Sequence, residues 1–546
     1  MDTGKREITL LDCTLRDGGY VNDWEFGHGN LVSIFERLVD SGVDVIETCF
    51  LDDRRPFDKN RSIMPDTASA KKIWESVGKR PPMVVGMIDY GTCAIENLEP
   101  ASESFFDGIR VIFKKHRMHE AMEYCAQVKA LGYKVYSQLV SITAYTDEEL
   151  KELVGLVNEV KPYAVSMVDT YGLLNPKWLL HYYEILDEYV DDSVRIGFHA
   201  HNNFQLAYAN VMAFLEKEAR HNILVDSTLF GMGKSAGNAP SELVAMHLNE
   251  EYGKSYDVRP MLEAIEESVQ DFYRTSPWGY KIFFYLCAKN KCHPSYETYF
   301  MRKDNLSISS LDDIMGWIEP EPEKLLYNVK TAEQTYQDYL EKECSDDADA
   351  EKFGEALKGR PVLVLGPGKN IQLQKKKVDE YIEKHHPITI SINYIPGAFD
   401  VDYVFTTNRR RYQQLTDVLK EVKNRDTQII ATTNLSCRDG EFAYIFNRAP
   451  LLEPEEDIKD NSFMMLLKIL HRVGVRQLAC AGLDGYSDRE DNYYNSSMEY
   501  SFVKAVALHL NSHMRKVIYE DYPDMEIDFI TYSHYTEVED SHTAAF

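Results

Sequence analysis

The sequence predicts an α/β protein: a TIM (β/α)8 barrel with a helical extension, followed by a second, Rossmann-like α/β domain. Three observations predict this organisation. The chain has 546 residues, which is too long for one ordinary core. Short β-rich segments alternate with amphipathic helical stretches from residue 8 to about 250, and this spacing of about 30 residues per repeat is typical of a barrel. A second series of strands begins near residue 361.

Eight β-rich segments are the predicted barrel strands, at residues 8–12, 43–47, 83–87, 108–112, 134–139, 164–168, 194–198 and 223–226. The stretches 31–41 and 120–131 between them have helical periodicity, and Gly132 is a helix stop. Almost every strand is followed by polar residues, and barrel active sites are built at that carboxyl end. An open, doubly wound sheet is the rival arrangement, but it would not need a polar residue after nearly every strand.

The rest of the chain is divided by composition. We expect a barrel at 1–250, a helical extension at 251–341, an acidic linker at 342–359 and a Rossmann-like domain at 360–546. The extension is rich in aromatic residues, which favours a layer that caps the barrel or forms a dimer contact, with a lid over the active site as the alternative. The linker is acidic and poor in large apolar residues, as in a linker or a solvated helix.

Charge and apolar content exclude several classes of partner. Lys and Arg total 60 against 88 Asp and Glu, for a formal charge of −28. Such a field repels phosphate backbones and anionic membrane surfaces, so we expect neither nucleic acid nor membrane as a partner. The sequence begins without an apolar core of signal-peptide length, and nine cysteines without a CxxC pair indicate reduced thiols. We therefore expect a cytoplasmic protein.

Two histidines end the predicted seventh strand and point to a metal site. His199 and His201 lie two residues apart, so their side chains project to the same side of a strand. Asp17 follows the first strand, which in a closed barrel is next but one to the seventh. Two imidazoles and a carboxylate leave open positions on an octahedral ion for a chelating substrate. The alternative is that Asp17 caps a turn and each histidine is satisfied by an ordinary hydrogen bond.

A glycine-rich stretch, FGMGKSAGNAPSE at residues 230–242, follows the eighth strand and leads into a helix. We expect backbone N–H groups around Gly233 and Gly237 to meet an anionic substrate, and Asn238 to reach the ion through its carbonyl oxygen. The alternative is a tight loop in which Asn238 only caps the helix.

Four segments carry a resemblance to a known family. LLDCTLRDGG, DTYG, FHAHNN and GMGKSAGNAPSE resemble, in this order, the motifs of the DRE-TIM metallolyases, which include 4-hydroxy-2-oxovalerate aldolase, HMG-CoA lyase, and the isopropylmalate and homocitrate synthases. The resemblance covers residues 6–250. It implies a divalent cation, Mn²⁺ or Mg²⁺ with Zn²⁺ as an alternative, held by Asp17, His199 and His201 with Asn238 as a further ligand or neighbour. It also implies a 2-oxo acid or hydroxy-oxo acid substrate, and we expect a homo-oligomer.

The resemblance implies roles for further residues. Arg16 would stabilise an enolate, because a guanidinium beside the developing negative charge lowers its energy. Glu47, which ends the second strand, would support the site or take part in proton transfer. Asp169 and Thr170 of the DTYG segment would contact the substrate.

One position departs from the family pattern. The hydroxy-oxo-acid aldolases carry a histidine three residues after the metal-binding aspartate, as their acid/base, and this chain has Tyr20 there. A phenol with a pKa near about 10 is a poor base at neutral pH, although it can donate a proton. Either Tyr20 acts as an acid, or the deprotonation is performed by His28, His116 or a metal-bound water.

These features predict a divalent-metal-dependent aldolase or lyase, which cleaves or forms a C–C bond beside a 2-oxo acid through a metal-stabilised enolate. Two alternatives stay open. One is a Claisen-type synthase that joins an acyl-CoA to a 2-oxo acid. The other is a catalytically lapsed barrel that serves a C-terminal nucleotide-binding or transferase domain, and the change at Tyr20 is its support.

The second half of the chain is predicted to form an open parallel sheet. The segment 362–365 runs into the turn Gly366-Pro367-Gly368, and further strands are predicted at 388–393, 402–408, 428–434 and 477–484. Several end in Asn or Asp, and ligands of open sheets bind beyond the carboxyl ends of the strands. VLVLGPGKN and AGLDGYS resemble the Rossmann-like domains of bacterial surface-carbohydrate proteins, including a sialyltransferase-like group. The resemblance implies that Gly366, Gly368 and Asn393 lie near a nucleotide.

Overall fold

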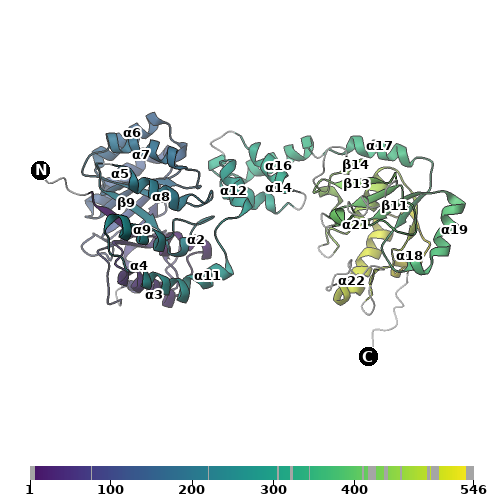
Figure 1. Cartoon of the computed structure of the whole chain (residues 1–546), viewed down its shortest axis with the longest axis horizontal. Helices are drawn as coiled ribbons and strands as arrows, with labels where there is room; N and C mark the ends of the chain where they lie inside the picture. Colours follow the sequence, from purple (N-terminus) through teal and green to yellow (C-terminus); the bar gives the residue numbers. More distant parts are fainter. Residues whose placement is uncertain are drawn as a thin grey trace, which may run out of the picture. The chain divides into compact units, whose positions relative to one another are not determined.

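The computed structural model divides into two compact units (Figure 1). The first consists of residues 1–297 and 319–327, and the second of residues 298–318 and 328–546. Each unit is described by itself. The structure describes residues 6–74, 77–218, 220–303, 306–319, 324–343, 345–408, 411–415, 426–435, 441–455, 458–487, 492–493 and 503–536.

The first unit contains a closed ring of eight parallel strands, which confirms the predicted TIM barrel. The ring consists of β1 (Ile8–Asp12), β2 (Val45–Leu51), β4 (Met83–Asp89), β5 (Gly108–Phe113), β6 (Lys134–Leu139), β7 (Ala164–Asp169), β8 (Arg195–Ala200) and β9 (Ile223–Ser227). It closes because β1 pairs with both β9 and β2. The short strand β3 (Ile63–Met64) adds to the edge of β2.

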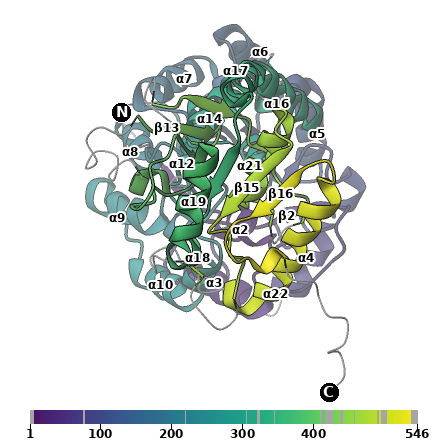
Figure 2. The same ribbon diagram turned by 90° about the vertical axis from the view of Figure 1, so that its right-hand side faces the viewer.

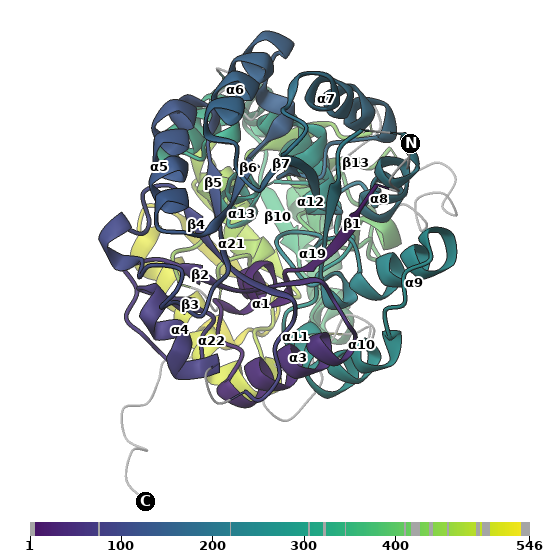
Figure 3. The same cartoon turned by 90° about the vertical axis from the view of Figure 1, so that its left-hand side faces the viewer.

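Helices surround the ring (Figure 3). They are α3 (His28–Asp40), α4 (Thr67–Trp74), α5 (Met118–Ala130), α6 (Asp147–Val160), α7 (Pro176–Tyr189), α8 (Ala207–Glu216), α9 (Ser241–Tyr252) and α10 (Val258–Ala264), and the short α1 (Thr14–Asp17) and α2 (Gly19–Asn22) follow β1. Local signals set their ends. Thr146 and Glu149 form a capping box at the start of α6, and Asn175 caps α7 just before its first-turn Pro176.

The interior of the ring has an apolar floor. Inward-facing side chains at the amino-terminal end of the strands pack together there: Leu11, Val45, Met83, Val85, Tyr136, Ala164 and Leu224. Side chains of a strand alternate with a period of two, so the positions two residues beyond Val45, Tyr136, Ala164 and Leu224 face the same way. They are the buried polar residues Glu47, Gln138, Ser166 and Asp226. The floor therefore supports a polar layer directly above it.

The predicted extension is divided between the two units. Its helices are α11 (Gln270–Thr275), α12 (Ile282–Lys289), α13 (Pro294–Met301), α14 (Ile308–Gly316) and α16 (Val329–Glu343), and a π-helical turn, η5 (Ile265–Val269), precedes α11. Residues 251–297 and 319–327 belong to the first unit, whereas 298–318 and 328–341 belong to the second. Among the described residues, no helix is both long and apolar enough to cross a membrane.

The second unit contains a seven-stranded parallel sheet (Figure 2). Its strands are β10 (Val362–Leu365), β11 (Ile388–Ile392), β12 (Tyr403–Thr406), β13 (Gln428–Thr432), β14 (Tyr444–Phe446), β15 (Gln477–Ala481) and β16 (Glu526–Phe529). The order across the sheet is β14-β13-β12-β11-β10-β15-β16. The edge strands β14 and β16 were not predicted, because they are short and their side chains are partly exposed, so they lack a continuous apolar pattern.

Helices pack on both faces of this sheet. They are α17 (Asp347–Leu357), α18 (Asn370–Leu373), α19 (Lys375–His385), α21 (Ser462–Arg472) and α22 (Val503–Lys516), with the π-helical turn η8 (Val517–Asp521) after the last. On β10, Val362 and Val364 join one apolar core with α17, α21 and α22, and Leu363 and Leu365 join another with α18 and α19. The alternation of β10 therefore produces a three-layer α/β/α unit.

The acidic segment 342–359 is not simply a linker. Residues 347–357 form α17, and Phe353 and Leu357 are buried in a core of the second unit, whereas residue 344 lies outside the described residues. The two apolar residues are four positions apart and lie on one helix face, which the surrounding acidic residues concealed in the sequence.

We expect Phe353→Ala to destabilise the second unit. Its ring is fully buried against Tyr403, Tyr444 and Phe446, and truncating a buried phenylalanine costs about 3–5 kcal/mol. Calorimetry of the whole chain should show one transition shifted downward and the barrel transition unchanged. The exposed neighbour Glu351→Ala is the control, and an equal shift in both variants would contradict the assigned packing.

Candidate metal and substrate site

His199 and His201 lie at the carboxyl end of β8, and both are buried. Nδ1 of His199 is 2.9 Å from a carboxylate oxygen of Asp226, and Nδ1 of His201 is 3.0 Å from the backbone carbonyl oxygen of Asp169. A carbonyl oxygen and an ionised carboxylate can only accept, so each Nδ1 is the donor. In the neutral form of each ring Nε2 therefore keeps a lone pair, as a metal-binding imidazole requires.

Asp17 and Asn238 complete this end of the barrel. Asp17 ends α1, and its carboxylate accepts bonds of 2.5 Å from both Nη1 of Arg16 and Nδ2 of Asn238. Nε2 of His201 is 3.7 Å from the same carboxylate. Asn238 is placed by a β-bridge between its backbone and that of His201. The loop after β9 is thereby fastened to the end of β8.

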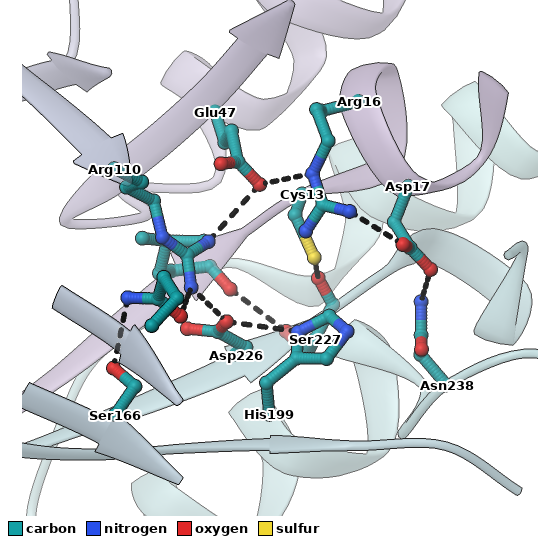
Figure 4. Close-up of polar contacts among 12 residues, drawn as sticks. Cys13, Arg16, Asp17, Glu47, Arg110, Ser166, His199, Asp226, Ser227 and Asn238 are labelled. Carbon is teal, nitrogen blue, oxygen red and sulfur yellow. Dashed lines mark hydrogen bonds and ion pairs between the residues drawn. The ribbon is translucent and has the colours of Figure 1, made fainter. Parts of the chain in front are cut away.

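A buried ionic network lies below these groups (Figure 4). The guanidinium of Arg110, on β5, bonds to Glu47 on β2 at 3.0 Å, to Gln138 on β6 at 2.9 Å, and to Asp226 on β9. Glu47 also accepts from Nε of Arg16 at 2.8 Å. The network therefore connects the barrel interior to Arg16 and, through Asp226, to His199.

The network determines the charge of each group. Burial alone raises the pKa of the Asp17 carboxyl, but Arg16 and His201 outweigh burial and hold this pKa well below its usual range. The pKa of Asp226 is also lowered, because Arg110 and His199 outweigh its burial. Burial lowers the pKa of His199 despite the opposing effect of Asp226. The site thus holds ionised carboxylates beside a neutral imidazole.

The arrangement fits a divalent cation. The ligand atoms of Asp17, His199 and His201 all lie within 4.8 Å of one another. Two buried acceptors beside them, Nε2 of His201 and Oδ1 of Asn238, have no hydrogen-bond partner in the described part of the chain. Burying such an atom costs about 1–3 kcal/mol unless it is satisfied, and a cation held by the three groups would satisfy Nε2 of His201.

A second group of potential ligands, Cys13, His199 and Asp226, lies equally close together. Here the contacts are already hydrogen bonds. Asp226 accepts from His199 and Arg110, and Sγ of Cys13 donates to the backbone carbonyl of Ser227 at 3.3 Å. Burial raises the pKa of the Cys13 thiol well above its usual value, so without a bound ion the thiol is protonated.

A cavity of about 360 Å³ opens above the three ligands. Its wall combines strand-end polar groups with residues of the extension: Arg16, Asp17, Tyr20, Met87, Asp89, Ile112, Lys114, Gln138, Val140, Val168, Thr170, Tyr171, His199, His201, Lys234, His293, Leu325, Leu326 and Tyr327. Residues 293 and 325–327 follow the barrel in sequence, so part of the extension forms a wall of this cavity.

Tyr20 lines this cavity, and Lys234 lies over its ring, with Nζ 5.5 Å from the centroid. Loss of hydration raises the pKa of the Tyr20 hydroxyl, with a smaller opposing effect from Arg16. Burial lowers the pKa of Lys234 and raises that of Asp89. Tyr20 is therefore a proton donor and not a base at neutral pH.

Several predicted site residues lie away from the cavity wall. Both carboxylate oxygens of Asp169 accept backbone N–H groups of its own loop, from Leu173 and Leu174, whereas Thr170 does line the cavity. Gly237 has a φ of +82°, and a Cβ there would meet the carbonyl oxygen of Gly231 at 2.0 Å, so it shapes the loop.

Gly233 and Glu47 support the ligands from behind. A Cβ on Gly233 would lie 2.5 Å from Oδ2 of Asp17 and 2.4 Å from Nδ2 of Asn238. This position must therefore be glycine for the two side chains to meet. Glu47 is fully buried and bonded to Arg16 and Arg110, which is a positioning arrangement and not one suited to proton transfer.

Among the described residues, the cavity contains one histidine besides His199 and His201, and it is neither His28 nor His116. His28 begins α3 and His116 lies in a short 3₁₀ turn, and neither lines this cavity, whereas His293 does. Nδ1 of His293 accepts the N–H of Ser295 at 3.1 Å. Its Nε2 therefore carries the ring proton. The sequence offered no signal for this, because His293 lies in a helical region without a strand end beside it.

The family comparison covers the barrel. Residues 7–266 match the HMGL-like family. Two relatives are 27% identical: a 4-hydroxy-2-oxovalerate aldolase 2 of Salinispora arenicola over 247 residues, which cover 45% of this chain and 69% of the relative, and a 4-hydroxy-2-oxovalerate aldolase of Thermomicrobium roseum over 260 residues, covering 47% and 71%.

Two solved structures are also similar. The N-terminal domain of a protein described as an aldolase, from Bacteroides vulgatus, aligns with a TM-score of 0.46 and 22% identity over 56% of this chain and 98% of that one. An HMG-CoA lyase from Pseudomonas aeruginosa aligns with a TM-score of 0.40 and 18% identity, covering 48% and 91%.

The barrel and its site define a metallolyase-type enzyme domain. Residues 7–266 form an HMGL-like domain of the DRE-TIM type, and the chain is a carbon–carbon lyase of the aldolase class.

We expect the His293 ring to stay neutral through the mildly acidic range. Burial lowers its pKa from 6.5 to about 4, so between these values the unfolded chain binds a proton that the folded chain excludes, and stability falls as the pH falls. Ring-nitrogen NMR shifts of histidine-labelled protein, with His293→Gln to assign the signal, measure the midpoint. A midpoint near 6.5 would contradict this environment.

Proposed function

We propose that this enzyme is a divalent-metal-dependent aldolase that cleaves or forms a C–C bond beside the oxo group of a 2-oxo acid. The observation that carries the proposal is the meeting of Asp17, His199 and His201 within 4.8 Å, with the guanidinium of Arg16 on the same cavity wall. The 4-hydroxy-2-oxovalerate aldolases among the relatives support the substrate class.

Asp17, His199 and His201 would hold the cation, with Asn238 as a further ligand or neighbour. Mn²⁺ or Mg²⁺ suits this set, and two imidazoles also admit Zn²⁺. When bound, the ion supplies Lewis-acid polarisation of the substrate oxygens. Asp226 and the carbonyl of Asp169 fix the two ring orientations from behind, so both Nε2 atoms present lone pairs.

Arg16 is prepared to stabilise negative charge on the substrate. Its Nε and Nη1 are used by Glu47 and Asp17, whereas Nη2 bonds to no described residue. Because Arg16 lines the cavity and is held on two sides, Nη2 can meet an enolate oxygen with little reorganisation. Burial of the whole group strengthens this interaction.

Tyr20 and His293 supply proton donors in the same cavity. Tyr20 is protonated at neutral pH, because a phenol has a pKa near about 10. His293 is neutral and carries its ring proton on Nε2, so it donates to an uncharged substrate oxygen. We propose that Tyr20 donates its proton to the alkoxide oxygen that forms when the C–C bond is made, and that the deprotonation needed for cleavage falls to another group.

The part of the substrate beyond the scissile bond has room beside the cavity. A second, mainly apolar cavity of about 820 Å³ shares five residues with the first: Lys114, Val140, Tyr171, Leu325 and Leu326. We propose that the carbonyl product, or the acceptor in the reverse direction, lies there, and that this partner is larger than a two-carbon aldehyde.

We expect the metal-free chain to take up Mn²⁺, measured by the EPR signal of the free ion. His201→Ala should abolish this uptake, and Gly233→Ala should weaken it by about 10–100-fold, because its Cβ displaces Asp17 and Asn238. Gly155→Ala, at an open helical position, and His119→Ala, on the surface, are matched controls. Equal uptake by His201→Ala would contradict the assigned ligands.

We expect the chain with Mn²⁺ or Mg²⁺ to release pyruvate from at least one member of a panel of 4-hydroxy-2-oxo acids. Arg16→Lys should lower kcat by about 10²–10³-fold while Mn²⁺ uptake is retained, because a lysine cannot bond to Glu47, Asp17 and substrate together. The exposed Arg274→Lys is the control.

The outcomes separate the alternatives. Free thiol released from acetyl-CoA and a 2-oxo acid, without pyruvate from the panel, would replace the aldolase by a synthase. Metal uptake with neither product would favour a lapsed barrel.

A further inference from the structure

The second unit has a crevice where its strand order reverses. From β10 the chain proceeds through β11, β12, β13 and β14 on one side, and then returns to add β15 and β16 on the other. Loops after β10 and β15 consequently leave the sheet in opposite directions. In open parallel sheets this point, beyond the carboxyl ends of the strands, is where ligands bind.

A cavity of about 550 Å³ occupies this crevice. Gly368 and Asn393, expected near a nucleotide, both line it, and Gly366 does not. A Cβ on Gly366 would meet the carbonyl oxygen of Gly482 at 2.4 Å, so Gly366 permits close packing of the loops after β10 and β15. Asn393 has a φ of +60°, and its amide donates to Ser462 at 2.8 Å, at the first turn of α21.

One part of the cavity wall is cationic. Arg411, which follows β12, and Arg448, which follows β14, both line it, and Arg411 is buried. Guanidinium groups recognise phosphate oxygens through paired N–H donors. Asp460 also lines the cavity. In a chain with a formal charge of −28, two arginines in one lining favour an anionic ligand.

Another part of the wall carries an acceptor. Asp484 follows β15, and its Oδ2 accepts the N–H of Asn370 at 2.8 Å. Its Oδ1 is buried and has no hydrogen-bond partner among the described residues. A Cβ on Gly368 would lie within 2.6 Å of both carboxylate oxygens, so glycine is required for this approach. Oδ1 is therefore suited to a hydroxyl or amino donor of a ligand.

Apolar side chains complete the wall. Leu510 and Met514 of α22, with Phe463 of α21 and Tyr486, line the same cavity. A sugar phosphate has no apolar face for these residues, whereas a nucleobase does.

We propose that this crevice binds a nucleoside phosphate, with the phosphate at Arg411 and Arg448, a ribose hydroxyl or base amino group at Asp484, and the base on the apolar wall. The inference does not depend on the metal-dependent reaction of the barrel. It assigns the second unit a ligand site of its own.

The test is calorimetric titration of the full chain in EDTA, which keeps divalent ions out of the barrel. The probes are the 5′-mono- and diphosphates of adenosine, guanosine, cytidine and uridine, with ribose 5-phosphate and inorganic phosphate. We expect at least one nucleotide to bind, ribose 5-phosphate to bind at least about tenfold more weakly, and His201→Ala to bind that nucleotide as the wild type does.

Variants at the two ends of the cavity distinguish the contacts. Arg411→Gln should weaken both the nucleotide and inorganic phosphate by about tenfold or more, and Asp484→Asn should weaken only the nucleotide. Arg448→Gln replaces the first variant if Arg411→Gln does not fold by circular dichroism. Arg476→Gln, outside the cavity, is the control.

Three results would overturn the proposal. The first is that no nucleotide of the panel binds at millimolar concentration. The second is that ribose 5-phosphate binds as tightly as every nucleotide. The third is that the Arg411 and Asp484 variants bind like the control.

Discussion

The barrel site depends on one fully buried cation, Arg110. Removing a guanidinium from water costs several kcal/mol, which is recovered only when its partners are well placed, and here Glu47, Asp226 and Gln138 surround it. Glu47 then holds Arg16, and Asp226 holds His199. The proposed enolate-binding group, Arg16, and one proposed metal ligand, His199, are therefore both oriented by a charge that does not line the cavity. Without Arg110, Glu47 would keep only Arg16 as a hydrogen-bond partner among the described residues, and Asp226 only His199.

The sequence was sufficient to predict the elements that have a local hydrophobic pattern. All eight barrel strands were predicted, because period-two apolar segments with polar ends recur along the chain. The grouping of Asp17, His199 and His201 followed from ring closure, which places the first strand near the seventh. Arg110 could not be predicted, since it lies inside an apolar strand and its partners are 63 and 116 residues away. His293 belongs to a helical region that follows the barrel. Hydrophobic periodicity predicts such helices but not where they pack, so its place in the cavity could not be predicted.

The two units form their cavities in different ways. A parallel sheet presents its loops and backbone N–H groups at one edge, so a ligand site needs a place where those loops separate. In the barrel, ring closure separates the loops around the whole carboxyl-terminal rim. The loop after β9 is held against β8 by the His201–Asn238 bridge. In the second unit, the loops separate where the strand order reverses at β10. Gly366 and Gly482 pack closely there, and Gly368 leaves room for the carboxylate of Asp484.

The hydrogen bond from His199 to Asp226 has a consequence for proton balance. An ordinary imidazole must often lose a proton when it becomes a ligand, so metal uptake competes with acid. Here burial lowers the pKa of His199, and its single proton already lies on the nitrogen that faces Asp226. Coordination through Nε2 would displace no proton from this ring. Acidification therefore weakens this ligand less than it would weaken a histidine exposed to solvent.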